Sequence, residues 1–188
     1  MARTGGAARA GIARGGVRCT VPRMTQPAAD TLIRTLHDFA VANAEGTRTF
    51  RLADIDELVY RDPIAAFDPV VRFAAELLAA LRRLKVGDLR SVQDLRADFD
   101  VNGPWEDDGA IRDEHTIGAF VHVLAAADND SIKIEYFDFH QPQDARVALW
   151  VLGRLIVDIV NILDDEIEDR RLRTEVLTTA TDRAVGIG

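Results

Sequence analysis

Residues 147–163 read VALWVLGRLIVDIVNIL, and this stretch decides the fold. Apart from Arg154, Asp158 and Asn161, almost every position in it is apolar. A helix with a single apolar stripe lies on a surface, whereas a helix that is apolar on most sides has to be enclosed. The sequence therefore predicts that this segment forms the central helix of the protein.

The polar positions and flanks of this segment lead to three further expectations. Arg154 and Asp158 are four residues apart, which is one helical turn, so we expect them to form an ion pair. If the chain left two sides of the helix uncovered, a second copy would have to cover them, and a homodimer through residues 147–163 is the expectation in that case. The whole helix is expected to start near Asp144 and to run past Glu168.

Other segments also show apolar residues at helical spacing, with capping residues at their ends. They predict helices from Asp30 to Gly46, from Asp54 to Asp62-Pro63, over residues 69–85 after Asp68-Pro69, over residues 91–97, and from about Arg112 to Asp128.

Two short segments alternate between apolar and polar residues instead. Residues 47–52 and 131–139 are predicted strands that pair antiparallel. The expected fold class is therefore mainly α, formally α+β, with five or six helices around residues 147–163 and one small antiparallel β element.

Length and charge predict one acidic domain behind a basic leader. The chain has 188 residues, which is about one domain, and a formal net charge of −8. Residues 1–23 carry five arginines and no acid, so the rest is more acidic still. We expect residues 1–26 to be a disordered leader, either a targeting segment or an upstream extension of a chain that starts at Met24, and residues 27–188 to be a single helical domain.

Composition also argues against several classes of function. An acidic body is repelled by nucleic acids and by anionic membranes, and there is no uncharged apolar run of about 18 residues to span a bilayer. The single cysteine, Cys19, predicts a reducing, cytoplasmic setting without disulfides or a cysteine-based metal site. Neither a Gly-x-Ser-x-Gly nucleophile motif nor a glycine-rich phosphate loop after a strand is present, so we lean towards a protein that is not an enzyme.

The acidic loop of residues 98–109 is the one segment that resembles a metal site. Its start, DFDVNG, places Asp98, Asp100 and Asn102 at alternating positions before a glycine, as in the first half of a calcium loop, and Glu106 falls at the ninth position. The twelfth position, where a bidentate glutamate belongs, is Gly109. The alternatives are a site for calcium or another divalent cation, joined by His115, or a solvated turn that binds no cofactor.

The same loop contains an aromatic residue among acids. Trp105 is followed by Glu106, Asp107 and Asp108, an arrangement typical of an interface anchor with a charged rim, although the ring could instead fold back over the core. Trp150, within the apolar helix, is expected in the core.

The basic cluster near the C-terminus is expected to be neutralised locally. Arg170, Arg171 and Arg173 follow a run of acids, and pairs of Glu166 with Arg170 and of Asp169 with Arg173 have the four-residue spacing of helical ion pairs. The sequence therefore does not predict a basic binding surface here.

These observations leave three hypotheses about function. The first is a non-catalytic adaptor, regulator or immunity-type binder that docks a basic or apolar protein surface through Trp105, Glu106, Asp107 and Asp108. The second is a metal-binding protein or metal-dependent enzyme that uses the acidic loop. The third is a non-catalytic subunit of a larger enzyme assembly, docked through the apolar helix.

Overall fold

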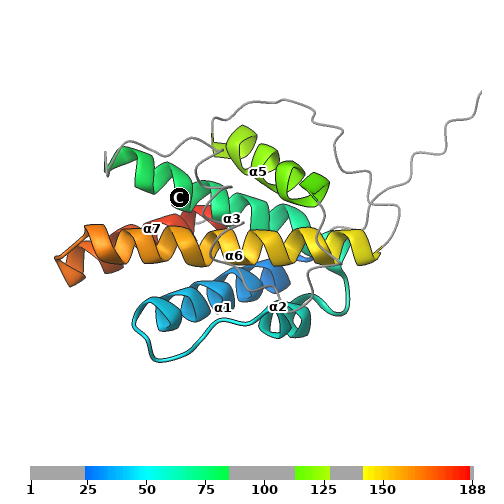
Figure 1. Cartoon of the computed structure of the whole chain (residues 1–188), viewed down its shortest axis with the longest axis horizontal. Helices are drawn as coiled ribbons and strands as arrows, with labels where there is room; N and C mark the ends of the chain where they lie inside the picture. The colour runs from blue at the N-terminus through cyan, green and yellow to red at the C-terminus, as the bar shows by residue number, and fades with distance from the viewer. Residues whose placement is uncertain (1–23, 85–112, 128–141, 187–188) are drawn as a thin grey trace, which may run out of the picture.

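A computed structural model describes residues 24–84, 113–127 and 142–186, and every structural statement below concerns these residues. They form helices (Figure 1), which confirms the mainly α class. The helices are α1 (Gln26–Ala44), α2 (Leu52–Val59), α3 (Pro63–Arg83), α5 (Asp113–Ala127), α6 (Pro142–Glu166) and α7 (Arg170–Ala184).

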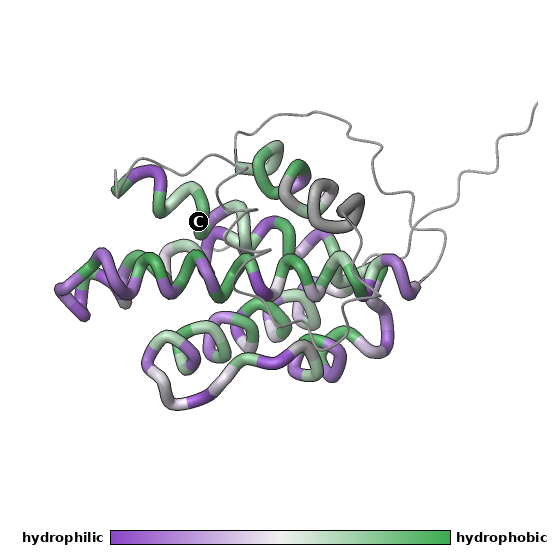
Figure 2. The backbone as a smooth tube through the Cα atoms, in the orientation of Figure 1, coloured by the Kyte–Doolittle hydropathy of each residue, from purple (hydrophilic) through white to green (hydrophobic). Residues whose placement is uncertain are grey.

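Helix α6 is the centre of the fold, as its sequence predicts. It runs the length of the molecule with α1 and α2 along one side and α5 along the other, and it packs most extensively against α3 (Figure 1). Apolar residues recur along the whole of α6 (Figure 2), and its buried residues include Leu149, Leu152, Ile156, Ile159 and Leu163. The core therefore lies between α3 and α6.

This burial changes the argument for a homodimer. The apolar residues of 147–163 are covered by other helices of the same chain, and Ile162 is the one that stays partly exposed. A homodimer stays a prediction, but this helix no longer requires one. Among the residues that the structure describes, no helix combines the length and the apolar content needed to cross a bilayer.

Helix α3 begins earlier than its sequence predicts. Asp62 caps it, since its carboxylate accepts a hydrogen bond from the backbone N–H of Ala65 at 3.0 Å, and Pro63 occupies the first turn. We expected a helix to end before this Asp-Pro pair, and α2 does end at Val59. We also expected Asp68-Pro69 to start the next helix, and that was wrong. Both pairs have the same local signal, and Pro69 is accommodated inside α3, where it is buried and removes one intrahelical hydrogen bond.

The predicted strand at residues 47–52 is also wrong. Leu52 opens α2, and the residues before it form a loop whose backbone is satisfied by the end of α1. Asn43 accepts a hydrogen bond from the N–H of Phe50 at 2.9 Å, and the carbonyl of Ala42 accepts from Thr47 at 2.9 Å. No strand occurs in the described ranges, and the expected partner strand at 131–139 lies outside them, as does the expected helix at 91–97.

The first two helices start at residues other than those predicted. Helix α1 begins at Gln26, and Asp30, the predicted cap, accepts a hydrogen bond from the Gln26 side chain instead. Met24 packs against the core just before it, so residues 24–26 belong to the folded unit. Asp54 is the third residue of α2, where its carboxylate accepts from the N–H of Arg51.

The predicted last helix is two helices. Helix α6 ends at Glu166, before Glu168, and Asp169 caps α7 by accepting hydrogen bonds from the N–H groups of Arg171 at 2.8 Å and Leu172 at 3.2 Å. Ile167 is buried between them and anchors the turn. The chain therefore reverses direction, and α7 packs against α3 and α1.

Candidate interaction site

The predicted site residues lie mainly outside the described part of the chain. This holds for the partner-binding residues Trp105, Glu106, Asp107 and Asp108 and for the metal ligands Asp98, Asp100, Asn102 and Glu106. The backbone of His115 is in α5, but its side chain is outside the described set. Within the described residues, no group of three or more His, Cys, Asp or Glu side chains is placed to hold a metal ion.

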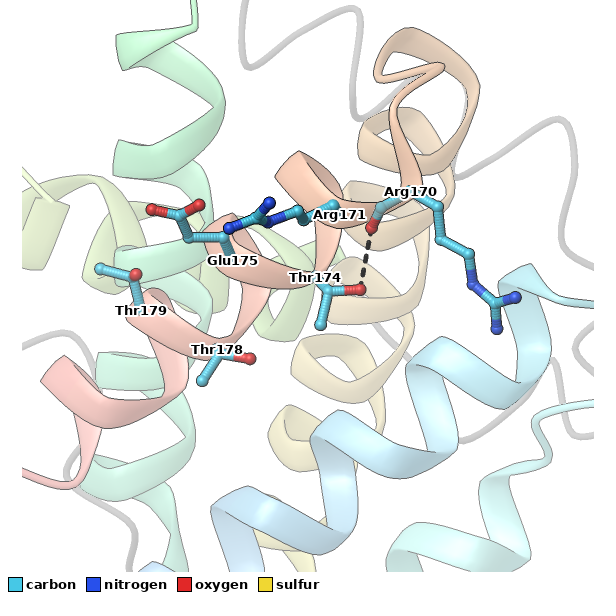
Figure 3. Close-up of a pocket in the computed structure, with 6 residues that line it drawn as sticks. All are labelled: Arg170, Arg171, Thr174, Glu175, Thr178 and Thr179. Carbon is cyan, nitrogen blue, oxygen red and sulfur yellow. Dashed lines mark hydrogen bonds between the residues drawn. The ribbon is translucent and has the colours of Figure 1, made fainter.

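The described surface is hollowed along the outer side of α7. The larger hollow has a volume of about 650 Å³ and is open to solvent. Figure 3 shows the side chains that line it: Arg170, Arg171, Thr174, Glu175, Thr178 and Thr179. These residues come from successive turns of one helix, so this hollow follows the helix axis.

A smaller hollow lies between α7 and the C-terminal end of α3. Its volume is about 160 Å³, and it shares Glu175 and Thr179 with the larger one. Its other described lining residues are Ala80, Arg83, Leu84, Leu172, Val176 and Arg183. The two hollows therefore form one continuous surface, which we call the α7 groove.

The sequence of α7 explains why one side of this helix stays free. Its buried residues are Leu177, Ala180, Thr181 and Ala184, which form a narrow stripe three and four residues apart. The hydroxyl of Thr174 donates a hydrogen bond to the carbonyl of Arg170 at 2.9 Å, so this hydroxyl has its hydrogen-bond partner within α7 (Figure 3). A narrow stripe of small residues holds the helix down and leaves a wide polar face.

Ion pairs to distant parts of the chain fix the helix in place. Arg173 pairs with Asp164 in the last turn of α6, both partly buried, and Arg170 pairs with Glu45, next to the end of α1, at 3.2 Å. In Figure 3 the Arg170 side chain extends away from the groove towards α1. The predicted pairs of Glu166 with Arg170 and of Asp169 with Arg173 are therefore wrong, because Asp169 caps the helix and the helices break between these residues.

The α7 groove is cationic although the protein is acidic. Its described lining holds four arginines and a single acid, Glu175. Arg83, Arg171 and Arg183 are exposed and form no ion pair with any described residue. Unpaired guanidinium groups in a concave surface raise the local potential and attract anionic groups. Sequence reasoning missed this surface because it assigned Arg170, Arg171 and Arg173 to local acids and did not consider Arg83 and Arg183.

The groove also exposes an apolar side chain. Leu172 is 44% exposed, and among the described residues Tyr60, at 72%, is the other large apolar side chain with high exposure. Tyr60 lies at the end of α2, where the Arg146 guanidinium sits 5.5 Å from its ring centre. Leu172 lines the smaller hollow, so its exposed side chain is part of a concave surface.

The network beside Tyr60 serves the core. Asp56 accepts a hydrogen bond from the indole N–H of Trp150 at 2.9 Å and lies 3.6 Å from Nε of Arg146. Trp150 is 8% exposed, which confirms its predicted place in the core. The carboxylate of Asp56 therefore satisfies a buried indole, which is a structural role.

Two other carboxylates have pKa values that are shifted in opposite directions. Burial of Asp54 acts to raise its pKa, but hydrogen bonds from the backbone of Arg51 and from the Arg48 guanidinium, at 2.6 Å, outweigh it, so the pKa is lowered. In Asp158 burial prevails over the attraction of Arg154, and the pKa is raised. The Arg154–Asp158 pair, at 3.0 Å, is itself confirmed.

The described histidines are held by their neighbours. His37 is in α1, with Nδ1 3.3 Å from the carboxylate of Asp38. His122 contacts the Phe67 ring edge-on, with 5.4 Å between ring centres, and burial lowers its pKa against the opposing charge of Asp68. Neither histidine lines the α7 groove.

Comparison of the chain with protein-family models, with curated proteins and with solved structures gave no match. The geometry described above is therefore the basis for a functional proposal.

Proposed function

We propose that this chain is a protein-interaction domain that acts without catalysis, as an adaptor, a regulator or an inhibitor, and that it binds its partner in the α7 groove. The observation that carries the proposal is the groove itself: a concave surface with an exposed leucine and with three arginines, Arg83, Arg171 and Arg183, that form no ion pair with any described residue. A polar rim around a small apolar centre is the usual composition of a transient protein interface.

The contacts that hold α7 support this assignment. The Asp169 cap and the pairs of Arg170 and Arg173 hold the helix in position before any partner arrives. A preformed surface loses little conformational entropy on binding. The groove therefore meets a second requirement of a docking site besides its shape and chemistry.

The loop around Trp105 remains a second proposed contact region. Its acids suit a basic partner surface, whereas the α7 groove suits an acidic one, so the two would contact different parts of a partner. The reducing cytoplasm remains the proposed compartment, because the chain has a single cysteine.

Site-specific photo-crosslinking tests the docking function. A photoreactive amino acid replaces Thr178, which is exposed in the groove, and in a matched variant it replaces Gln143, which is exposed at the far end of α6. Helix α6 has 25 residues, so its ends are about 37 Å apart at 1.5 Å per residue. In cells that express the chain, we expect a discrete cross-linked species from position 178 that is absent from position 143. No such species, or the same species from both positions, would contradict the proposal.

A further inference from the structure

We infer that the segment bound in the α7 groove is an acidic, amphipathic protein segment, with one large apolar side chain in the smaller hollow and carboxylates paired with the groove arginines. This inference rests on the docking function proposed above and specifies the chemistry of the partner. Three properties of the groove support it: the volume of the smaller hollow, the placement of the charges, and the unfavourable energy of other occupants.

The smaller hollow has the size of one apolar side chain. Four of its eight described lining residues are apolar, namely Ala80, Leu84, Leu172 and Val176, and the hollow is partly open to solvent, with a volume of about 160 Å³. An apolar cavity of about 150 Å³ in another protein accommodates a benzene molecule. A leucine or phenylalanine of a partner therefore fits, and it would cover the exposed face of Leu172, which is 44% exposed.

The charges lie at the edges of this apolar surface. Arg83 comes from α3 and Arg183 from the last turn of α7, so cations approach the smaller hollow from both helices that form it. Arg171 adds a third cation in the adjoining hollow. A guanidinium group binds a carboxylate with two parallel hydrogen bonds, and these three make no ion pair within the described structure. Carboxylates on both sides of an apolar residue would satisfy this pattern.

Other occupants fit less well. A second copy bound through the same face would bring the same arginines together, and the net charge of −8 on each copy adds repulsion elsewhere. A nucleic acid supplies anions, but it is repelled by the acidic body and offers little to the apolar floor. A basic segment would place like charges against Arg83 and Arg183.

Peptide binding with matched charge variants tests the inference. The probe is a labelled helical peptide of about 16 residues with one leucine flanked by glutamates three and four positions away, long enough to form helix. The control peptide carries lysine in place of each glutamate. Fluorescence polarisation with the full chain is expected to show at least about tenfold tighter binding of the acidic peptide, and the preference is expected to weaken as salt is added. Equal binding, or tighter binding of the lysine peptide, would overturn the inference.

Protein variants locate the binding. Arg171→Glu together with Arg183→Glu is expected to weaken binding of the acidic peptide at least about tenfold, whereas Arg61→Glu, an exposed arginine before the start of α3, is expected to leave it unchanged. Leu172→Ala retains every charge and is expected to weaken binding several-fold through the lost apolar contact. Equal loss in Arg61→Glu would show attraction by net charge alone and would overturn the inference.

The outcomes separate this inference from the docking function. Cross-linking from position 178 combined with no preference for the acidic peptide would retain the function and reject the partner chemistry. No cross-linking from position 178 would reject the function, and with it the basis of the inference. A concentration-dependent dimer that Leu172→Asp dissociates would assign the groove to a second copy and would also reject the inference.

Discussion

Helices α6 and α7 follow one another in the chain, separated by three residues, yet their surroundings differ completely. In α6 most positions are buried, and this helix contacts all five of the other described helices, whereas α7 buries only Leu177, Ala180, Thr181 and Ala184. The first is held by apolar burial around most of its circumference. The second is held by a narrow stripe, an aspartate cap and ion pairs. The amino-acid composition of each helix therefore determines its role: the apolar α6 forms the centre of the core, and the polar α7 forms part of the surface.

The largest expected effect comes from replacing a buried leucine of α6, compared with an exposed leucine of α7. Leu152 in α6 is 0% exposed and Leu172 in α7 is 44% exposed. We expect Leu152→Ala to lower the free energy of unfolding by about 2–5 kcal/mol, because it leaves a cavity in a packed core. Leu172→Ala is expected to change it by less than about 0.5 kcal/mol. Urea unfolding measures both, and similar losses would show that α7 is as integral to the core as α6.

The second test concerns the buried carboxylate of Asp54, which ties the loop after α1 to α2. Its side chain is 3% exposed and accepts hydrogen bonds from Arg48 and from the N–H of Arg51. Asp54→Asn is expected to lower the free energy of unfolding at pH 7 by about 1.5–3 kcal/mol, the range for hydrogen bonds to charged groups. Chemical unfolding across a pH series measures the difference from the unmodified chain.

The pH dependence of that difference has a defined sign. The pKa of Asp54 is lower in the folded protein than the value of about 3.9 in an unfolded chain. The stabilisation is therefore complete above pH 4 or so and is lost as the pH falls through the folded pKa, so the two proteins are expected to converge in acid. Asp158 has a raised pKa, so its contribution runs the opposite way and is lost as the pH rises. Asp158→Asn is the control, and a loss at pH 7 as large as that of Asp54→Asn would contradict the assignment.

The contact between α6 and α2 offers a third test. A Cβ atom added at Gly153 would lie 2.6 Å from Cδ1 of Ile55 and 3.1 Å from the Phe50 ring. Gly153→Val is expected to cost about 1–3 kcal/mol through overpacking. Adding Ile55→Val removes the Cδ1 atom and is expected to recover part of that loss in a double-mutant cycle. Additive losses would show that the two side chains do not compete for the same space.

The parts of the fold that the sequence predicts correctly are those set by long apolar patterns. The central position of α6 and the Arg154–Asp158 pair follow from one continuous stretch. Helix boundaries were predicted less accurately. The Asp-Pro pairs at 62–63 and 68–69 both have the sequence signal of a helix start, and only the packing of α3 distinguishes them. The alternating pattern at residues 47–52 comes from a loop in which Phe50 is half-buried. A pattern of only six residues cannot distinguish a strand from a turn.

The candidate site could not be predicted from local patterns. Helix α7 has a low mean hydropathy and a weak apolar periodicity, so nothing in its sequence requires burial of a particular face. The cluster of Arg170, Arg171 and Arg173 was visible in the sequence, but which of these arginines form ion pairs depends on the tertiary fold. Arg170 pairs with Glu45, 125 positions away, and Arg171 is left without an ion pair in the described structure.

The smallest expected effects come from the ion pairs that hold α7, and they measure how firmly the groove is fixed. Arg170 and Glu45 have side chains 79% and 38% exposed, so their pair is solvated, whereas Arg173 and Asp164 are 19% and 27% exposed. Arg170→Ala is expected to change the free energy of unfolding by less than about 0.5 kcal/mol, as for other surface pairs. Arg173→Ala is expected to cost more, about 1–2 kcal/mol, because it leaves the less solvated Asp164 without its partner. Thermal and urea unfolding of the two variants give the ranking. The reverse order would mean that α7 is held to the tip of α1 rather than to the end of α6, and the groove would then move with α1.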